Sequence, residues 1–292
     1  KSQRWRIGSG VSRPAPRQQL RTRGTVLGVA WLVGVAVLSL GVPAWSLTRL
    51  LLESRRTELD VGELVGAVVG SASSSILGAA LALLLALPIA ALAARYRSRI
   101  VRSIEGAAFL GHALPGVVVG LSLVFLTLAV LPAAYQTLAV LAFAYAVLFL
   151  PKAIGSSRSA IAHVPPGLES TARSLGRGPL RAWCTVTGRL AWPGIAAGTL
   201  LVVLTAMKEL PATLMLRPTG FNTLATELWS RTEIQAFGSA APYALTMIVL
   251  ASVPAWLMGR WMARSPETAA STDRADDEMV RTDEVAYVGG VR

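Results

Sequence analysis

Six long apolar runs dominate this sequence of 292 residues. A helix needs about 20 apolar residues to cross a bilayer core of about 30 Å, and lipid offers the backbone no hydrogen-bond partners. The sequence therefore predicts an all-α polytopic membrane protein with six transmembrane helices. The predicted spans lie at residues 25–47, 64–94, 106–131, 135–154, 190–210 and 242–261.

Composition excludes a single soluble domain. Hydrophobic residues make up 53% of the chain and charged residues only 15%, against about 25% in an ordinary soluble domain. The first apolar run follows an arginine-rich segment and resembles a signal peptide in that respect. It exceeds the roughly 7–15 apolar residues of a signal core, so a transmembrane span is the favoured interpretation.

The positive charges indicate how the chain is oriented. Lys and Arg in the loops and flanking segments divide into 19 on one side of the predicted spans and 6 on the other. The positive-inside rule places the richer side, with both termini, in the cytoplasm. Because these residues are spread over several loops, the net charge of +12 is better explained by topology and membrane lipid than by nucleic acid.

Three regions follow from this pattern. Residues 1–24 form a basic cytoplasmic arm, residues 25–264 a six-helix transmembrane domain, and residues 265–292 a cytoplasmic tail. The tail holds seven acids and almost no large apolar residue, so we expect it to be disordered. A single cysteine, Cys184, excludes an intrachain disulfide and a multi-cysteine metal site. We therefore expect no metal, cofactor or catalytic residue.

The second apolar run carries small residues at every fourth position. Such rows allow helix backbones to approach closely in lipid, which favours a central, tightly packed helix that touches more than one neighbour. The alternative is composition alone, since more than half of this segment is Gly, Ala or Ser. The row consists of Gly66, Gly70, Ser74, Gly78, Ala82, Ala86, Ala90 and Ala94.

Two places in the spans are candidates for the transport pathway. Pro115 and Gly116 interrupt the third span, where a kink or break is expected. Lys208 and Glu209 are ionisable residues at the end of the fifth span. The alternatives are a harmless kink and a charge pair at the membrane interface. His112 is interpreted as a packing residue on the cytoplasmic side, distant from Lys208 and Glu209.

The loop at residues 155–189 has the pattern of a helix–turn–helix. Glu169 suits the first turn of a helix that begins at two prolines, and Gly176 is placed for a C-terminal cap. Leu168, Ala172 and Leu175 form an apolar stripe. A second helix starts at proline after the turn and ends at glycine before the fifth span. The stripe predicts a soluble partner with a groove, or else contact with the membrane surface.

The long segment 211–241 is the best candidate for contact with an external partner. Its middle, residues 223–237, can form an amphipathic helix with Leu224, Leu228 and Ile234 on one side.

These motifs resemble a known family. Residues 169–176, Glu-Ser-Thr-Ala-Arg-Ser-Leu-Gly, are similar to the Glu-Ala-Ala…Gly loop of permease subunits of type I ABC importers. Residues 113–118 (Ala-Leu-Pro-Gly-Val-Val), 208–218 (Lys-Glu-Leu-Pro-Ala-Thr-Leu-Met-Leu-Arg-Pro) and 223–226 (Thr-Leu-Ala-Thr) resemble the ferric-iron branch. The chain departs from the signature at Ser170 and Thr171, where Glu and Ala are usual, and at Gly188-Arg189, where Leu-Pro is usual.

The resemblance implies a fold and partners. It implies a permease of the bacterial plasma (inner) membrane, cytoplasmic ATP-binding subunits docked at residues 168–176, and an extracytoplasmic solute-binding protein. It also implies a second permease half, fused or separate, and a start at Lys1 would suit the C-terminal half of a fusion. The chain has no G-x-x-x-x-G-K-[ST] phosphate loop, so ATP hydrolysis would belong to a partner.

Other functions remain alternatives at this stage. Related permeases carry thiamine, polyamines, phosphonates or oxyanions in place of ferric iron. An integral-membrane enzyme would need His112, Lys208 and Glu209 to converge. A secondary transporter would need ionisable residues at mid-depth of the other spans, which are almost without them.

Overall fold

The computed structural model describes residues 22–53, 60–96 and 98–263. The predicted tail at 265–292 and nearly all of the predicted arm at 1–24 lie outside these residues. In the described part every regular element is a helix, as predicted. The chain divides into two compact units, residues 1–49 and 50–292, which are described separately.

The first unit contains the first span. Helix α1 (Thr22–Ala36), the π-helical turn η1 (Val37–Gly41) and α2 (Val42–Glu53), which runs on past the unit, follow one another directly. Together they supply an apolar stretch at Thr22–Leu52, long enough to cross a bilayer. A single helix has no core of its own, so its apolar side chains require lipid or protein around them.

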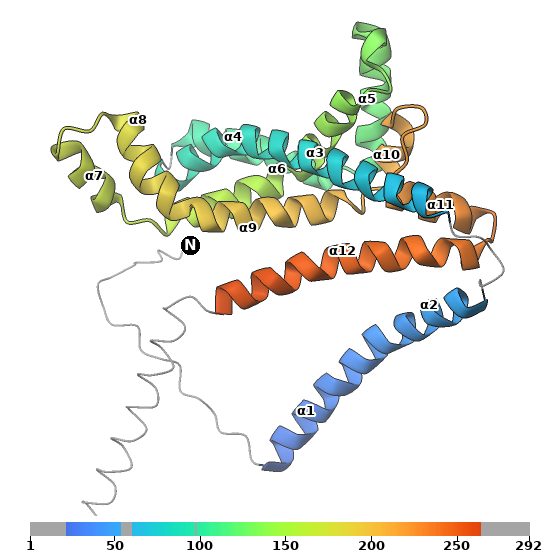
Figure 1. Cartoon of the computed structure of the whole chain (residues 1–292). Helices are drawn as coiled ribbons and strands as arrows, with labels where there is room; N and C mark the ends of the chain where they lie inside the picture. The colour runs from blue at the N-terminus through green and yellow to red at the C-terminus, as the bar shows by residue number, and fades with distance from the viewer. Residues whose placement is uncertain (1–21, 54–59, 97, 264–292) are drawn as a thin grey trace, which may run out of the picture. The chain divides into compact units, whose positions relative to one another are not determined.

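The second unit holds the remaining spans (Figure 1). Its long helices are α3 (Val61–Arg95), α6 (Leu138–Ala162), α9 (Arg189–Ala206) and α12 (Phe237–Ala263). Helix α4 (Arg99–Ala113) and helix α5 (Gly116–Val130) are bent by 98° relative to each other. The predicted third span is therefore broken at Leu114 and Pro115, because proline cannot continue the hydrogen-bond ladder. Among residues 22–53, 60–96 and 98–263, which include the first span, five helices are long and apolar enough to cross a membrane, or six if this bent pair is one span.

Shorter helices connect the long ones. Between α6 and α9 lie α7 (Pro166–Ser174), α8 (Pro179–Ala182) and the π-helical turn η4 (Trp183–Gly188). Between α9 and α12 lie α10 (Pro211–Leu216) and α11 (Leu224–Glu233), and a 3-10 turn, η3 (Pro132–Ala134), precedes α6. Helix α11 confirms the predicted amphipathic helix in part, since Leu224 is buried but Ile234 is exposed.

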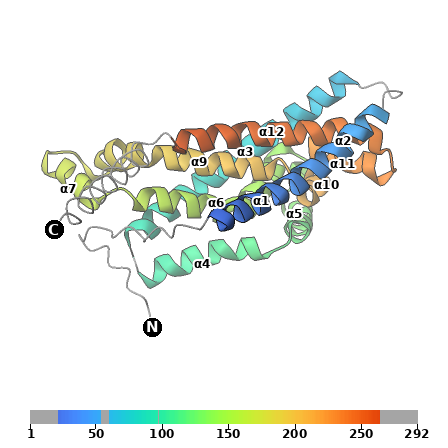
Figure 2. The same cartoon turned by 90° about the horizontal axis from the view of Figure 1, so that it is seen from below.

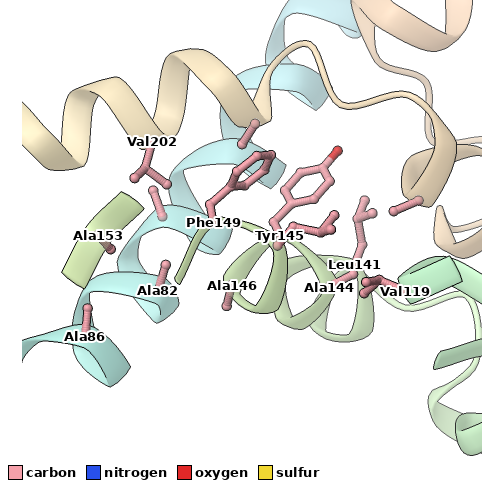
Figure 3. Packing of buried hydrophobic residues seen from close by; sticks show 14 of the residues in the cluster. Ala82, Ala86, Val119, Leu141, Ala144, Tyr145, Ala146, Phe149, Ala153 and Val202 are labelled. Carbon is pink, nitrogen blue, oxygen red and sulfur yellow. The ribbon is translucent and has the colours of Figure 1, made fainter. Parts of the chain in front are cut away.

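The core lies where α3 packs on α6 and α9, with α5 and α10 at one end. Figure 3 shows Tyr145 and Phe149 of α6 between the small side chains of α3 and Val202 of α9. Gly78 makes this packing possible, since a methyl group on it would lie 2.5 Å from Cβ of Tyr145. Small residues on α3 therefore allow the helix backbones to approach one another closely in lipid.

The predicted central role of α3 is confirmed. Gly70, Ser74, Gly78, Ala82, Ala86 and Ala90 of its small-residue row are buried. Gly70 meets the backbone carbonyl of Asn222, Gly78 meets α6, and Ala90 packs with Ile195 of α9. The row therefore winds around the helix and meets several neighbours, as its four-residue spacing requires. Gly66, at the N-terminal end of the row, is exposed.

Two predicted boundaries are wrong. Helix α6 continues to Ala162, so the loop between α6 and α9 begins about eight residues later than position 155. Gly188 does not end the second loop helix, because its φ of −61° is helical, and α8, η4 and α9 form one continuous helix from Pro179 to Ala206. Pro193 lies inside this helix, where a bend or a local π-turn can satisfy the carbonyl that proline leaves free.

Candidate functional sites: the helical loop before the fifth span and the broken span

Helix α7 starts and ends as the sequence predicted. Pro165 and Pro166 begin it, and Glu169 lies in its first turn. At its end, the N–H of Gly176 donates to the carbonyl of Arg173 at 3.0 Å, and the N–H of Arg177 donates to the carbonyl of Ala172 at 3.2 Å. This is a Schellman cap, and Gly176 has the left-handed backbone (φ +87°) that such a cap requires.

The apolar stripe of α7 is divided between two environments. Ala172 is buried inside the chain, where α7 packs on α8 and η4, whereas Leu168 and Leu175 are 47% and 79% exposed. The interpretation of all three as one docking surface is therefore wrong for Ala172. Ala172 lies at the contact of α7 with α8 and η4, whereas the side chains of Leu168 and Leu175 lie outside this contact and are exposed.

Glu169 fixes α7 to the start of the fifth span. Its Oε1 accepts from the Arg173 guanidinium at 2.6 Å, and its Oε2 accepts from the hydroxyl of Thr187 at 3.1 Å. Thr187 is fully buried in η4. The acid that the sequence places one position before the family's usual glutamate thus forms a structural link, which the sequence pattern alone did not reveal.

Arg95 connects the same loop to the end of α3. Its Nη1 donates to the carbonyl of Val164 at 3.1 Å, directly before α7 begins. The loop is therefore held by the C-terminal end of α3 and by η4, which leads directly into α9, so a displacement of α7 would act on both helices. Basic residues at a helix C-terminus are favourable because they complement the helix dipole.

The structure brings part of the second candidate site together. Pro115 is the N-cap of α5 and Gly116 its first residue. The carboxylate of Glu209 lies against this point, since a methyl group on Gly116 would be 2.6 Å from its Oε1. Glu209 and Gly116, one residue from each candidate pair, therefore lie together at the break in the third span. Lys208 is exposed and makes no such contact in the described structure.

A tyrosine that sequence reasoning did not single out completes this second site. The phenol of Tyr145 lies 2.6 Å from the hydroxyl of Thr213 in α10, which in turn donates to the backbone carbonyl of Glu209 at 2.6 Å. Tyr145 is buried and comes from the middle of α6. Its hydroxyl is the only polar side-chain group in residues 138–151 of α6 and was the available signal, because a buried phenol requires a hydrogen-bond partner.

An ionic cluster fastens α11 to its neighbours. The Arg231 guanidinium donates to Glu63 of α3 at 2.7 Å and to the phenol of Tyr243 at 2.8 Å, and lies 3.3 Å from Glu227. Burial of Glu227 and repulsion by Glu63 raise the pKa of the Glu227 carboxyl, while Arg231 opposes them. These contacts serve to hold α11 in place between α3 and α12.

Metal-binding residues do not gather within the described part of the chain. Groups of three or more His, Cys, Asp or Glu placed to hold a metal ion are not found among residues 22–53, 60–96 and 98–263. Cys184 is exposed near the start of η4.

The comparisons with known proteins identify the family. Residues 86–264 match the family described as "Binding-protein-dependent transport system inner membrane component". The chain belongs to this family. It is consequently a multi-pass protein of the inner membrane, with the fold of a type I ABC importer permease, as the sequence predicted.

Curated relatives include permeases for two solutes. The chain is 34% identical to the Fe(3+)-transport system permease protein FbpB 2 of Haemophilus influenzae over 87% of this chain. It spans about half the length of that relative (51%). It is 29% identical to the molybdenum transport system permease protein ModB of Mycobacterium bovis and of Mycobacterium tuberculosis, over 62% of this chain and 72% of each relative.

Solved structures agree on the fold. A chain of the MetNI methionine ABC transporter in inward-facing conformations superposes with a TM-score of 0.57 at 14% identity, covering 68% of this chain and 93% of that one. A chain of a bacterial alginate ABC transporter, solved with an alginate-bound periplasmic protein, gives a TM-score of 0.59 at 17% identity, with coverages of 83% and 95%. At these identities the likeness concerns the fold alone.

Proposed function

We propose that this chain is a permease subunit of a binding-protein-dependent importer, and that its solute is ferric iron. The assignment of iron as the solute is supported by the 34% identity to an Fe(3+)-transport permease over 87% of the chain. The described residues hold no cluster of metal-binding side chains. Selection of iron would therefore rest with an extracytoplasmic solute-binding protein, and this chain would provide the path.

Three partners belong to this proposal. Cytoplasmic ATP-binding subunits would dock at the exposed leucines of α7 and supply the energy, because the sequence has no phosphate loop. A second permease half, fused or separate, would complete the pathway. The second candidate function is oxyanion import, which the 29% identity to two molybdenum permeases supports.

Uptake of radiolabelled solute distinguishes the two functions. In the native host, deletion of the gene should lower the uptake of ferric iron at limiting concentration by at least about tenfold, since the subunit would be obligatory for that route. Uptake of molybdate should be unchanged, and expression of the intact gene should restore iron uptake. Loss of molybdate uptake with normal iron uptake would contradict the proposal and establish the oxyanion alternative.

Labelling of cysteine tests the proposed orientation. The native Cys184, exposed near the cytoplasmic loop, should react with a membrane-impermeant maleimide only after the membrane is permeabilised. In a Cys184→Ser background, a cysteine at the exposed Ser230 of α11 should react from outside, and one at the exposed Ser159 should not. The reverse pattern would contradict cytoplasmic termini.

A further inference from the structure

The contact between Glu209 and Gly116 joins two segments that are far apart in the sequence and differ in character. Helix α5 is the second half of the broken span, and α10 is a short helix that follows the end of α9. Figures 1 and 2 both show α10 beside α5. We propose that the Glu209 side chain is a latch that holds α10 against α5, and that solute passage requires its release.

One carboxylate oxygen serves both segments. Oε1 of Glu209 accepts from the N–H of Ala212 in α10 at 3.2 Å, and the same oxygen lies over Gly116 at the start of α5. A helix N-terminus carries partial positive charge and stabilises a nearby anion. Helix α5 has 15 residues, so its dipole is fully developed at this point. The charge on Glu209 therefore favours the closed contact.

Packing around this carboxylate makes the contact specific. Gly120 lies one turn after Gly116, and a methyl group on it would lie 3.1 Å from Cα of Ala212 and 3.2 Å from Sδ of Met215. Two glycines four residues apart thus give α5 a smooth face on which α10 lies. Beside this face, Val119 and Leu123 of α5 pack in one core cluster with Ala212 and Leu216 of α10, so apolar packing and the Glu209 contact together hold the two helices.

A second contact holds the other side of α10. The phenol of Tyr145 lies 2.6 Å from the Thr213 hydroxyl, and Tyr145 packs on Gly78 of α3. This contact involves neutral groups in the rigid core. Helix α5 packs on α6 as well, but it follows α4 through the bent break. We therefore expect the movement at α5, with the Glu209 contact as the one that opens.

The latch lies at the end of a rigid connection from the cytoplasm. Glu169 joins α7 to Thr187 in η4, and a continuous helix runs from Pro179 to Ala206. Glu209 follows that helix after a short turn. A displacement of α7 would move this continuous helix and so shift the equilibrium between the closed and the open Glu209 contact. This role in transport rests on the proposed function, whereas the latch itself is a property of the chain.

Spin-label distances test the latch directly. Labels at Val118 on α5 and Leu214 on α10, which are 44% and 40% exposed, report the separation of the two helices in the Cys184→Ser chain purified with its native partners in lipid nanodiscs. Glu209→Gln keeps an oxygen for the Ala212 N–H but removes the charge. We expect it to raise the ratio of separated to closed conformers about tenfold, within the range of helix-dipole effects.

Two further variants separate a latch from a general packing role. Lys208→Gln removes a neighbouring charge from an exposed side chain and should leave the distances unchanged. Gly116→Ala should displace the carboxylate and reproduce the effect of Glu209→Gln. Because both act on one contact, Gly116→Ala combined with Glu209→Ala should open the contact no further than Glu209→Ala alone.

The outcomes are decisive in each direction. Unchanged distances in Glu209→Gln, or additive effects in the double variant, would overturn the latch. If Glu209→Gln does not accumulate, unchanged distances in Gly116→Ala would overturn it as well. Iron uptake by the same variants is measured in parallel. A parent chain that takes up no iron while the distances respond as described would refute the proposed function and leave the latch intact.

Discussion

Replacement of Leu175 by arginine should remove the proposed ATP-binding subunit from the complex while leaving this chain folded. Leu175 follows the last residue of α7 and is 79% exposed, so the chain itself loses nothing when the side chain changes. An exposed leucine at the end of a short capped helix is typical of a residue that a partner groove covers. A charge there without a partner opposes binding. We expect association to weaken at least about thirtyfold, which corresponds to about 2 kcal/mol.

A matched control exists at the end of another short helix, α11. Ile234 is 74% exposed, follows the last residue of α11, and precedes a residue with positive φ, Gln235, just as Leu175 precedes Gly176. Ile234→Arg therefore makes the same chemical change in the same local geometry. The ATP-binding protein that co-purifies with the parent should be retained by Ile234→Arg and lost from Leu175→Arg.

The measurement is co-purification followed by titration in detergent. Normal retention of that protein by Leu175→Arg would show that α7 is not the docking element. Failure of the parent to co-purify any ATP-binding protein would instead contradict the proposed partner. Both results are interpretable because neither substitution touches a buried contact.

The local features of the loop were predictable because they depend on residues close in sequence. The ends of α7 depend only on local residues. Two prolines and an acid mark its start, and a glycine that can adopt a left-handed backbone marks its end. The environment of Ala172 was not predictable. An apolar stripe indicates that something covers it, and the pattern is the same whether the cover is α8 of the same chain or another protein.

The contacts between residues far apart in the sequence could not be predicted from the sequence pattern. Glu209 reaches Gly116 because the chain turns back after α9, and no local signal specifies the direction of that turn. The break at Pro115 was predictable from proline chemistry, but the charge that stabilises the start of α5 was not. The continuous helix through Gly188 was missed for a related reason, since glycine ends a helix only when the backbone turns left-handed there.

The close contact at Gly78 leads to the largest expected effect on stability. Gly78→Leu would place a branched side chain where even a methyl group lies 2.5 Å from Cβ of Tyr145 and 3.0 Å from its ring. Tyr145 is fully buried between α3, α9 and α10, so it cannot move aside (Figure 3). Overpacking of a dense core costs about 1–3 kcal/mol, and this position should reach the upper end, about 3 kcal/mol.

Gly66 provides the control on the same helix. It belongs to the same four-residue row, yet an added methyl group would meet no heavy atom within 4 Å. Gly66→Leu should therefore change the free energy of unfolding by about 0.5 kcal/mol or less, as surface substitutions do. Reversible unfolding of the purified chain in mixed micelles, followed by circular dichroism, measures both variants against the parent.

The double variant decides whether the tyrosine contact is the cause. Gly78→Leu with Tyr145→Ala gives the new leucine the space of the lost ring, so the combined loss should be clearly smaller than the sum of the two single losses. Tyr145→Ala alone should be destabilising, because it leaves a cavity and frees the hydroxyl of Thr213. Strict additivity would mean that Gly78 matters for another neighbour, and equal losses for Gly66→Leu and Gly78→Leu would mean that the close approach of α3 and α6 does not stabilise this fold.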